Sequence, residues 1–282
     1  MRAFWGRSRF HAPFQHLTRK RRDFAQRFLR VILVAQRRVA AEQYLASPQS
    51  IASFIDHTLL KPEAAESDIV RLCGEAREHV FKTVCVNPCW VETARRELTN
   101  SSVLVCTVIG FPLGANLSEV KLREARLALE QGTAEIDMVQ NIGALRSGNS
   151  AFVAAEISSL AHAAHEAGAI LKVIVETSVL SDEQKTLSSR LARESGADFV
   201  KTSSGFSSAG ATEGDVRLLR AAVGSSIGVK ASGAVRTLDA VRRMVEAGAS
   251  RIGTSSGVSI LREAAQPHMA SAGAPAARPD SY

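Results

Sequence analysis

Short apolar runs alternate with amphipathic stretches eight times between residues 54 and 255. The runs are rich in β-branched residues and lie at 54–60, 82–86, 103–109, 134–139, 170–177, 198–202, 227–232 and 250–255. Continuous apolar runs of this length are typical of parallel strands buried on both faces. Eight strand–helix units in about 210 residues predict an α/β fold, specifically a (β/α)8 TIM barrel.

The stretches between the runs have the composition of amphipathic helices. The clearest runs from Ser118 to Gly132, and similar stretches lie at 151–168, 182–196 and 237–248, each ending in glycine. Ser118 and Thr237 are candidate N-cap residues, because their side chains can accept a hydrogen bond from the first helical turn. The alternative is a doubly wound open sheet. The first strand lacks a following G-x-G-x-x-G loop, which favours the barrel.

The positive charge of the chain is concentrated at its N-terminus. Residues 1–40 contain eleven Lys or Arg and one acidic residue, giving +10, whereas the whole chain carries +7. The remaining residues therefore sum to −3, and we expect no nucleic-acid partner. We predict a basic extension at 1–50, partly helical or disordered, a barrel at 51–264 and a disordered tail at 265–282.

The role of the basic extension stays open at this stage. An Arg-rich, acid-poor N-terminus is typical of an organellar transit peptide, but also of an amphipathic helix, here 23–45, that packs on the barrel, a membrane surface or a partner. A dispensable arm is the simplest interpretation. The sequence has no apolar run of about 18 residues, so no transmembrane helix is expected. We predict a cytoplasmic protein, with organellar targeting as the alternative.

The cysteines indicate a reducing compartment rather than a disulfide framework. Four cysteines in 282 residues are too few for such a scaffold. Cys85 and Cys89 form CVNPC, which is a poor zinc site because no further Cys or His lies nearby in the sequence. We therefore predict no metal site.

Three lysines and an aspartate lie within the predicted strands. In parallel barrels the active site lies at the C-terminal ends of the strands, where we place Asp137, Lys172, Lys201 and Lys230. Two neighbouring ammonium groups repel, which lowers the pKa of one and leaves a free amine that can attack a carbonyl. Asp137 can balance charge and move protons through a water. The pattern predicts Schiff-base chemistry, although each residue alone could be structural: a snorkelling lysine, a Lys201–Asp137 pair, or a Lys172–Glu176 pair.

Glycine and serine clusters follow the last three strands. They are Ser204–Gly205, Ser232–Gly233 and Gly253–Thr254–Ser255–Ser256. Loops after strands 7 and 8 of such barrels often hold a phosphate through backbone N–H groups and hydroxyls. Ordinary turns use the same residues, which is the alternative.

These stretches resemble one family closely. The matching motifs, in unbroken order, are IDHTLLKP (55–62), VCVNP (84–88), TVIGFPLG (107–114), EIDMV (135–139), LKVIVET (171–177), FVKTSSGF (199–206), GVKASGAVRT (228–237) and RIGTSSG (251–257). They resemble the deoxyribose-phosphate aldolases, class I aldolases on a TIM barrel. The resemblance implies reversible cleavage of 2-deoxy-D-ribose 5-phosphate to D-glyceraldehyde 3-phosphate and acetaldehyde, with no metal or organic cofactor.

The resemblance also implies residue roles. Lys201 would form the Schiff base, Lys230 would be the lysine that lowers the pKa of the nucleophile, and Asp137 would relay protons. Lys172 and Cys85 would support this cluster. The phosphate pocket would be lined by Gly205, Ser232, Gly233, Ser255 and Ser256.

One departure from the family pattern concerns the phosphate pocket. The family usually has two glycines after the serine of KAS, and here the second is Ala234. Its methyl group would crowd a phosphate unless its φ is negative. Two alternative functions remain: another Schiff-base aldolase of phosphorylated substrates, or an inactive sugar-phosphate-binding barrel. The sequence leaves the oligomeric state open, with a homodimer as the candidate.

Overall fold

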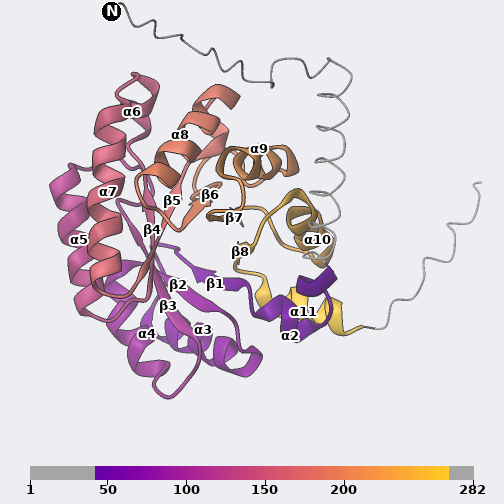
Figure 1. The fold of residues 1–282 in the computed structure, drawn as a ribbon. Helices are drawn as coiled ribbons and strands as arrows, with labels where there is room; N and C mark the ends of the chain where they lie inside the picture. The colour runs from indigo at the N-terminus through magenta and orange to yellow at the C-terminus, as the bar shows by residue number, and fades with distance from the viewer. Residues whose placement is uncertain (1–41, 267–282) are drawn as a thin grey trace, which may run out of the picture. The chain divides into compact units, whose positions relative to one another are not determined.

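Eight parallel strands close into a barrel. The computed structural model describes residues 42–266. The strands pair in sequence order, and β8 closes on β1 (Figure 1). Their bounds are β1 Ile55–Leu59, β2 Thr83–Val86, β3 Leu104–Ile109, β4 Glu135–Val139, β5 Ile170–Ile174, β6 Phe199–Lys201, β7 Gly228–Ser232 and β8 Arg251–Thr254.

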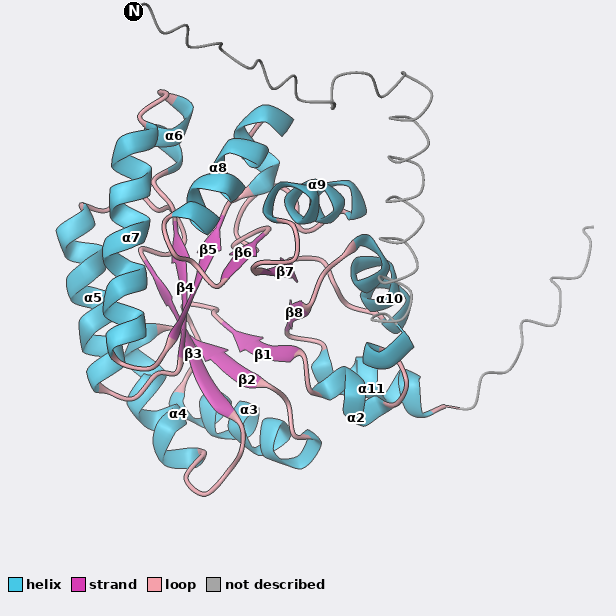
Figure 2. Cartoon of the chain, in the orientation of Figure 1, coloured by secondary structure: helices cyan, strands magenta, loops and turns pink. Residues whose placement is uncertain are grey.

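A ring of helices surrounds the strands, as Figure 2 shows. Helices follow each strand, which confirms the predicted TIM barrel and excludes the open sheet. Their bounds are α2 Pro48–Ala52, α3 Glu66–His79, α4 Val91–Glu97, α5 Ser118–Glu130, α6 Ile142–Arg146, α7 Ser150–Glu166, α8 Asp182–Glu194, α9 Glu213–Val223, α10 Leu238–Ala247 and α11 Gly257–Ala265, with 3-10 turns η1 Pro88–Trp90 and η2 Thr177–Val179.

One predicted strand is shorter than its apolar run. The run 170–177 becomes β5, which ends at Ile174. Glu176 then adopts a left-handed conformation with φ of 59°, and the chain turns into η2. A non-glycine residue in this region breaks the extended backbone, which explains why apolar composition alone overestimates the strand.

The two N-cap predictions have different outcomes. The Thr237 side chain accepts a hydrogen bond from the Ala240 N–H, as an N-cap should. Ser118 is not an N-cap, because α5 begins at Ser118 itself and Leu117 precedes it without a side-chain cap. The Ser118 hydroxyl instead donates to Glu156 Oε1 at 2.9 Å, which joins α5 to α7.

A buried ion pair strengthens this α5–α7 contact. Lys121 and Glu156 are fully buried, and Lys121 Nζ lies 2.9 Å from Glu156 Oε2. Lys121 Nζ also donates to the Val139 carbonyl at 2.9 Å, and Glu156 Oε2 accepts from the Asn141 N–H at 3.2 Å. Burial lowers the pKa of Lys121, although Glu156 opposes the shift. The pair therefore fixes the chain just beyond β4.

The barrel has two cores of different character. A large aliphatic core lies between the strands and the helices and includes Ile55, Val84, Ile136 and Leu171. A second, small cluster contains Leu60, Cys85, Cys106 and Val108, with Phe111 packed against it. Charged side chains make up much of the rest of the barrel interior, where TIM barrels usually have layers of branched apolar residues.

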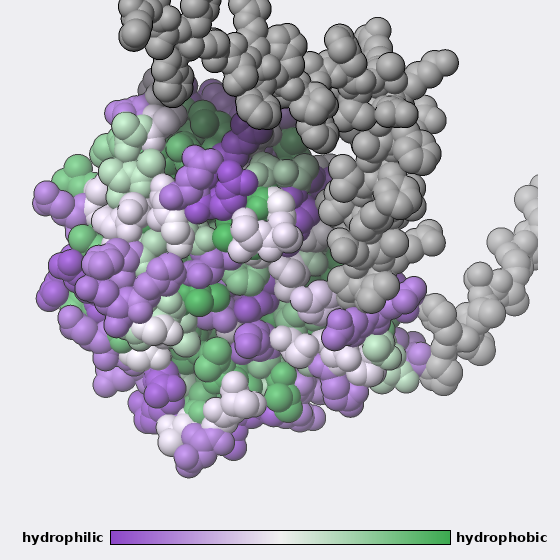
Figure 3. Space-filling model, viewed as in Figure 1, coloured by the Kyte–Doolittle hydropathy of each residue, from purple (hydrophilic) through white to green (hydrophobic). Residues whose placement is uncertain are grey.

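The predictions for the two chain ends fall largely outside the described residues. Within 42–266, Tyr44 and Leu45 pack against the large core, and α2 contacts α11. In this part of the chain, none of the helices is both long and apolar enough to span a bilayer. The face seen in Figure 3 mixes hydrophilic and hydrophobic residues.

Candidate active site

Three lysines converge on one buried carboxylate. Lys172 Nζ donates to Asp137 Oδ1 at 2.8 Å. Lys201 and Lys230 both donate to the other oxygen, Oδ2, at 2.9 and 2.7 Å. Lys201 and Lys230 are register partners on β6 and β7, so the backbone brings their side chains to the same level of the barrel. The structure therefore brings the four residues together. The predicted position at the strand ends is confirmed for Lys201 and wrong for Asp137, Lys172 and Lys230, which lie in the middle of β4, β5 and β7.

A second layer of charge lies against this group. Lys172 Nζ lies 2.6 Å from Glu135 Oε2, and Lys230 Nζ lies 2.5 Å from Asp56 Oδ2. Arg251 Nη1 donates to Asp56 Oδ1 and to Glu135 Oε2, both at 2.8 Å. Within residues 42–266, this cluster thus joins four cationic side chains to three carboxylates.

The charges hold one another ionised. Burial opposes ionisation of Asp137, but Lys172, Lys201 and Lys230 outweigh it and hold the pKa of Asp137 well below its usual range. Burial also opposes the charged form of Lys230, but Asp137 and Asp56 outweigh it and raise the pKa of Lys230. The two carboxylates thus favour the charged form of Lys230.

Sequence reasoning missed Glu135 and Arg251 and gave Asp56 no role. A signal for Glu135 was present, because side chains two residues apart point to the same side of a strand, and Glu135 precedes Asp137 by two. Arg251 begins β8 and resembles a surface residue flanking an apolar run. The suggested Lys172–Glu176 pair is wrong: Lys172 contacts Glu135 and Asp137, whereas Glu176 accepts from the Ser204 N–H at 3.3 Å.

A cavity opens at the C-terminal ends of β1, β6, β7 and β8. Its volume is about 320 Å³. Of the three clustered lysines, Lys201 lines it, whereas Lys172 and Lys230 do not. The other lining residues are Thr58, Leu59, Leu60, Lys61, Ser204, Gly205, Phe206, Ser232, Gly233, Ala234, Val235, Arg236, Gly253, Thr254 and Ser255.

Four of the five predicted phosphate residues line this cavity. They are Gly205, Ser232, Gly233 and Ser255. The buried Ser232 Oγ has no hydrogen-bond partner among the described residues, so it is available to a ligand. Ser256 is not a lining residue, and its N–H donates to Thr254 Oγ1 at 2.9 Å.

Ala234 occupies a backbone conformation that favours glycine. Its φ is 62°, so the condition of a negative φ, under which its methyl would be harmless, does not hold. Ala234 also lines the cavity and is exposed. The methyl group therefore lies at the cavity wall and adds backbone strain.

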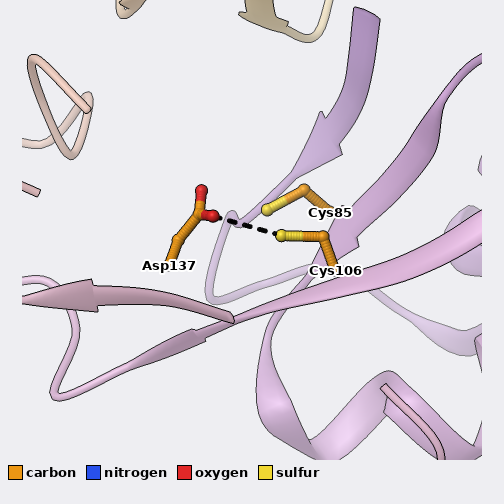
Figure 4. Close-up of side chains that lie close together, drawn as sticks. All are labelled: Cys85, Cys106 and Asp137. Carbon is orange, nitrogen blue, oxygen red and sulfur yellow. Dashed lines mark hydrogen bonds between the residues drawn. The ribbon is translucent and has the colours of Figure 1, made fainter. Parts of the chain in front are cut away.

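Two cysteines lie beside Asp137. Cys85 on β2 and Cys106 on β3 are register partners, and Figure 4 shows both side chains directed toward Asp137. One ligand atom from each of these three residues could hold a metal ion, since all three atoms lie within 4.8 Å of one another. Asp56, Cys106 and Glu135 form a second such group. All three carboxylates already bind Lys or Arg, so a cation would have to displace an ammonium or guanidinium group.

Comparisons with known proteins show which family the chain belongs to. A family described as "DeoC/LacD family aldolase" matches residues 50–267. Deoxyribose-phosphate aldolase of Bacillus subtilis is 54% identical over 76% of this chain and 95% of its own length. That of a Geobacillus species is 53% identical over 75% of this chain and 95% of its own.

Solved structures show the same similarity. "QR15, an Aldolase" is 41% identical, covers 76% of this chain and 95% of its own, and superimposes with a TM-score of 0.72. Deoxyribose phosphate aldolase from Aeropyrum pernix, described as a tetramer, is 36% identical, covers 81% of this chain and 95% of its own, and has a TM-score of 0.75.

Proposed function

The chain belongs to the DeoC/LacD family of aldolases, and from that premise we propose that it is a deoxyribose-phosphate aldolase. It would cleave 2-deoxy-D-ribose 5-phosphate reversibly to D-glyceraldehyde 3-phosphate and acetaldehyde. The observation that carries this proposal is the convergence of Lys172, Lys201 and Lys230 on Asp137 beside a cavity.

Lys201 is the proposed nucleophile. It lines the cavity and has one carboxylate contact, to an Asp137 oxygen that Lys230 also occupies. Lys172 contacts Glu135 and Asp137 and lies deeper in the barrel. With four cations for three carboxylates, one amine of the cluster can be neutral while every carboxylate keeps a cationic partner. A neutral amine is what Schiff-base formation requires.

The proposed steps follow from this assignment. The amine adds to the C1 carbonyl, and loss of water from the carbinolamine gives an iminium ion. A base removes the proton of the C3 hydroxyl, the C2–C3 bond breaks, and its electrons form an enamine. Protonation of C2 and hydrolysis then release acetaldehyde. Asp137, held as a carboxylate between the lysines, would move these protons through a water.

The phosphate would bind to the glycine and serine residues of the cavity. Gly205, Ser232, Gly233 and Ser255 line the cavity, and Ser232 Oγ has no partner among residues 42–266. Backbone N–H groups and hydroxyls of this kind bind phosphate without a metal. Lys61 and Arg236, which also line the cavity, add two cations that sequence reasoning did not assign.

The test is reductive trapping of the imine. The protein is incubated with acetaldehyde and borohydride, digested, and analysed by mass spectrometry for N-ethyl-lysine. We expect ethylation at Lys201 in wild type and neither label nor turnover of 2-deoxy-D-ribose 5-phosphate in Lys201→Met. A matched control is Lys82→Met, because Lys82 is exposed and precedes β2 at the opposite end of the barrel.

Three other outcomes of the trapping experiment would each favour a different explanation. Near-full turnover by Lys201→Met would eliminate the Schiff-base mechanism at this residue. Selective labelling of Lys201 without cleavage of 2-deoxy-D-ribose 5-phosphate would indicate a Schiff-base aldolase with another substrate. An unlabelled, folded protein would indicate a barrel that binds sugar phosphates without catalysis.

A further inference from the structure

The proposed aldolase steps use neither thiol of the Cys85–Cys106 pair. Both side chains are buried, with 1% and 0% of their surface exposed. They extend from neighbouring strands toward the same point in the barrel (Figure 4). Their sulfur atoms lie within 4.8 Å of each other. Cys106 Sγ also donates to Asp137 Oδ1 at 3.3 Å, so a change at this pair reaches the centre of the lysine cluster.

The backbone spacing suits a covalent link between the two sulfurs. Cys85 and Cys106 are direct register partners in the parallel β2–β3 pair. Neighbouring strands lie about 4.8 Å apart. Disulfides form when Cα atoms are about 4.4–6.8 Å apart and the Cβ vectors do not point apart. Formation of a disulfide between Cys85 and Cys106 then requires mainly rotation of the two side chains.

The two thiols have different chemical character. The adjacent Cys106 side chain has the largest effect on the pKa of Cys85 and lowers it; burial opposes this effect, and Lys230 and Lys201 support it. Burial raises the pKa of Cys106 well above its ordinary value. Of the two thiols, Cys85 is therefore the more readily deprotonated and Cys106 the less. Reactive cysteine pairs in redox proteins have this asymmetry.

We propose that Cys85 and Cys106 form an oxidisable dithiol, a modification site for hydrogen peroxide and related small peroxides, which closes to a disulfide between β2 and β3. The cavity provides access, because Leu60 both lines it and packs in the same small cluster as the two cysteines. Hydrogen peroxide is little larger than water, so a small displacement of Leu60 would admit it to the two thiols.

The chemistry needs only the peroxide as co-reactant. The Cys85 thiolate attacks one peroxide oxygen, the O–O bond breaks, and the other oxygen takes a proton and leaves as water. The Cys106 thiol then attacks the Cys85 sulfenic acid, the S–O bond breaks, and a second water leaves as the S–S bond forms. The two sulfurs lose two electrons in total, and the peroxide gains them.

The disulfide would stop the aldolase reaction reversibly. In the reduced protein, Cys106 Sγ lies 3.4 Å from Lys172 Nζ. In the disulfide, Cys106 has no S–H to donate to Asp137, and its sulfur moves toward β2 and away from Lys172. Both changes disturb the side chains around Asp137. A dithiol reductant restores the two thiols and the original contacts.

The test measures the masses of the cysteine peptides and the turnover of the enzyme in the same samples. Folded protein is treated with hydrogen peroxide, quenched in acid, alkylated and digested with trypsin. Cleavage after Lys82, Arg95, Arg96 and Lys121 gives peptides 83–95 and 97–121, which hold Cys85 and Cys106 respectively. Cys89 lies in the first peptide, so the link is assigned in Cys89→Ser, whose exposed side chain lies outside the lysine cluster.

We expect a linked 83–95/97–121 pair, a loss of two hydrogens per chain, and turnover that falls in proportion to the linked fraction. Dithiothreitol should reverse all three changes. Cys73→Ala should respond as wild type does, since burial raises the pKa of Cys73 to about 12 and makes it unreactive. Cys106→Ala should instead stop at a sulfenic acid on Cys85, which dimedone labels.

The proposal is overturned if peroxide leaves both thiols reduced in folded protein, if Cys85 proceeds to sulfinic acid without the link, or if the link joins another pair. Because the linked peptide is detected by mass, this result does not depend on the substrate assigned above. Failure of the aldolase assignment and failure of the dithiol are therefore distinguishable.

Discussion

At the scale of single residues, both oxygens of Asp137 are engaged by lysines. Oδ1 binds Lys172, and Oδ2 is shared between Lys201 and Lys230. A shared acceptor couples the two amines, because a proton lost from one strengthens the remaining bond to the other. Asp137 thus balances the charge of the cluster and, among the described residues, is the carboxylate that contacts all three lysines.

Asp137→Asn should damage both activity and stability. The amide cannot act as an acid or base, so we expect kcat to fall by about 10²-fold or more. It also leaves buried ammonium groups with fewer partners, which should lower the free energy of unfolding by about 3 kcal/mol at neutral pH. Steady-state kinetics and urea unfolding measure the two effects.

The loss of stability caused by Asp137→Asn should become smaller as the pH falls. Burial raises the folded-state pKa of Asp137, but the three lysines lower it by more, so it lies below its usual value. Its contribution is therefore complete above the unfolded-state pKa of about 3.9 and is lost as the pH falls toward the folded-state value. The difference between wild type and Asp137→Asn should shrink as the pH falls below about 4. A difference that grows in acid would contradict this assignment.

Ala234→Gly should relieve strain at the cavity wall. Ala234 has a φ of 62°, which costs an L-residue about 1 kcal/mol relative to glycine. We expect a higher midpoint of urea unfolding and a lower KM for phosphorylated substrates, with kcat nearly unchanged. The matched control is Gly233→Ala, where a new Cβ would lie 2.8 Å from the Gly210 Cα and should destabilise the loop. Equal effects of the two variants would argue against strain as the cause.

At the scale of elements, the Lys121–Glu156 pair ties α5 and α7 to the end of β4. Removing one partner leaves a buried charge, so Lys121→Met should lower the free energy of unfolding by about 3–5 kcal/mol. The double variant Lys121→Met/Glu156→Leu should recover much of this loss, because neither charge remains. A double-mutant cycle in urea tests the coupling, and additive losses would show that the two residues act independently.

Most of the elements could be predicted from the sequence, because each strand is buried on both faces. Seven strands lie within one or two residues of the apolar runs, since burial by helices on one side and by barrel packing on the other makes the whole run apolar. The exception, β5, ends early because the backbone of Glu176 turns left-handed, and composition does not encode that turn.

The candidate site was predictable only in part. Lys201, Lys230 and Asp137 interrupt apolar runs, and a charge inside a buried strand is conspicuous in sequence. Arg251 is at the start of β8, where a cation normally reaches water. That it turns inward to Asp56 depends on barrel closure between β8 and β1, which brings together residues 195 positions apart. No local pattern records such a pairing.

At the scale of the whole molecule, the barrel should function without residues 1–40. We expect a chain that begins at residue 41 to keep its melting temperature and its kcat/KM, because the proposed catalytic cluster lies wholly between Asp56 and Arg251. Its net charge should change from +7 to −3, so it should bind an anion exchanger at neutral pH. Loss of activity in this folded fragment would show that the basic extension contributes to the site.

The four cations and three carboxylates inside the barrel also affect how a substrate arrives. When all seven groups are ionised, the interior has one unit of uncompensated positive charge, enclosed by low-dielectric walls and open toward the cavity. Such a geometry focuses field lines through the opening. An anionic sugar phosphate is then attracted to the opening of the cavity, although the chain without its basic extension carries a net negative charge. The reducing end of the sugar reaches the amine after the phosphate has been oriented. While the amine still carries its proton, this excess charge increases the rate of encounter, and dissolved salt progressively reduces the effect.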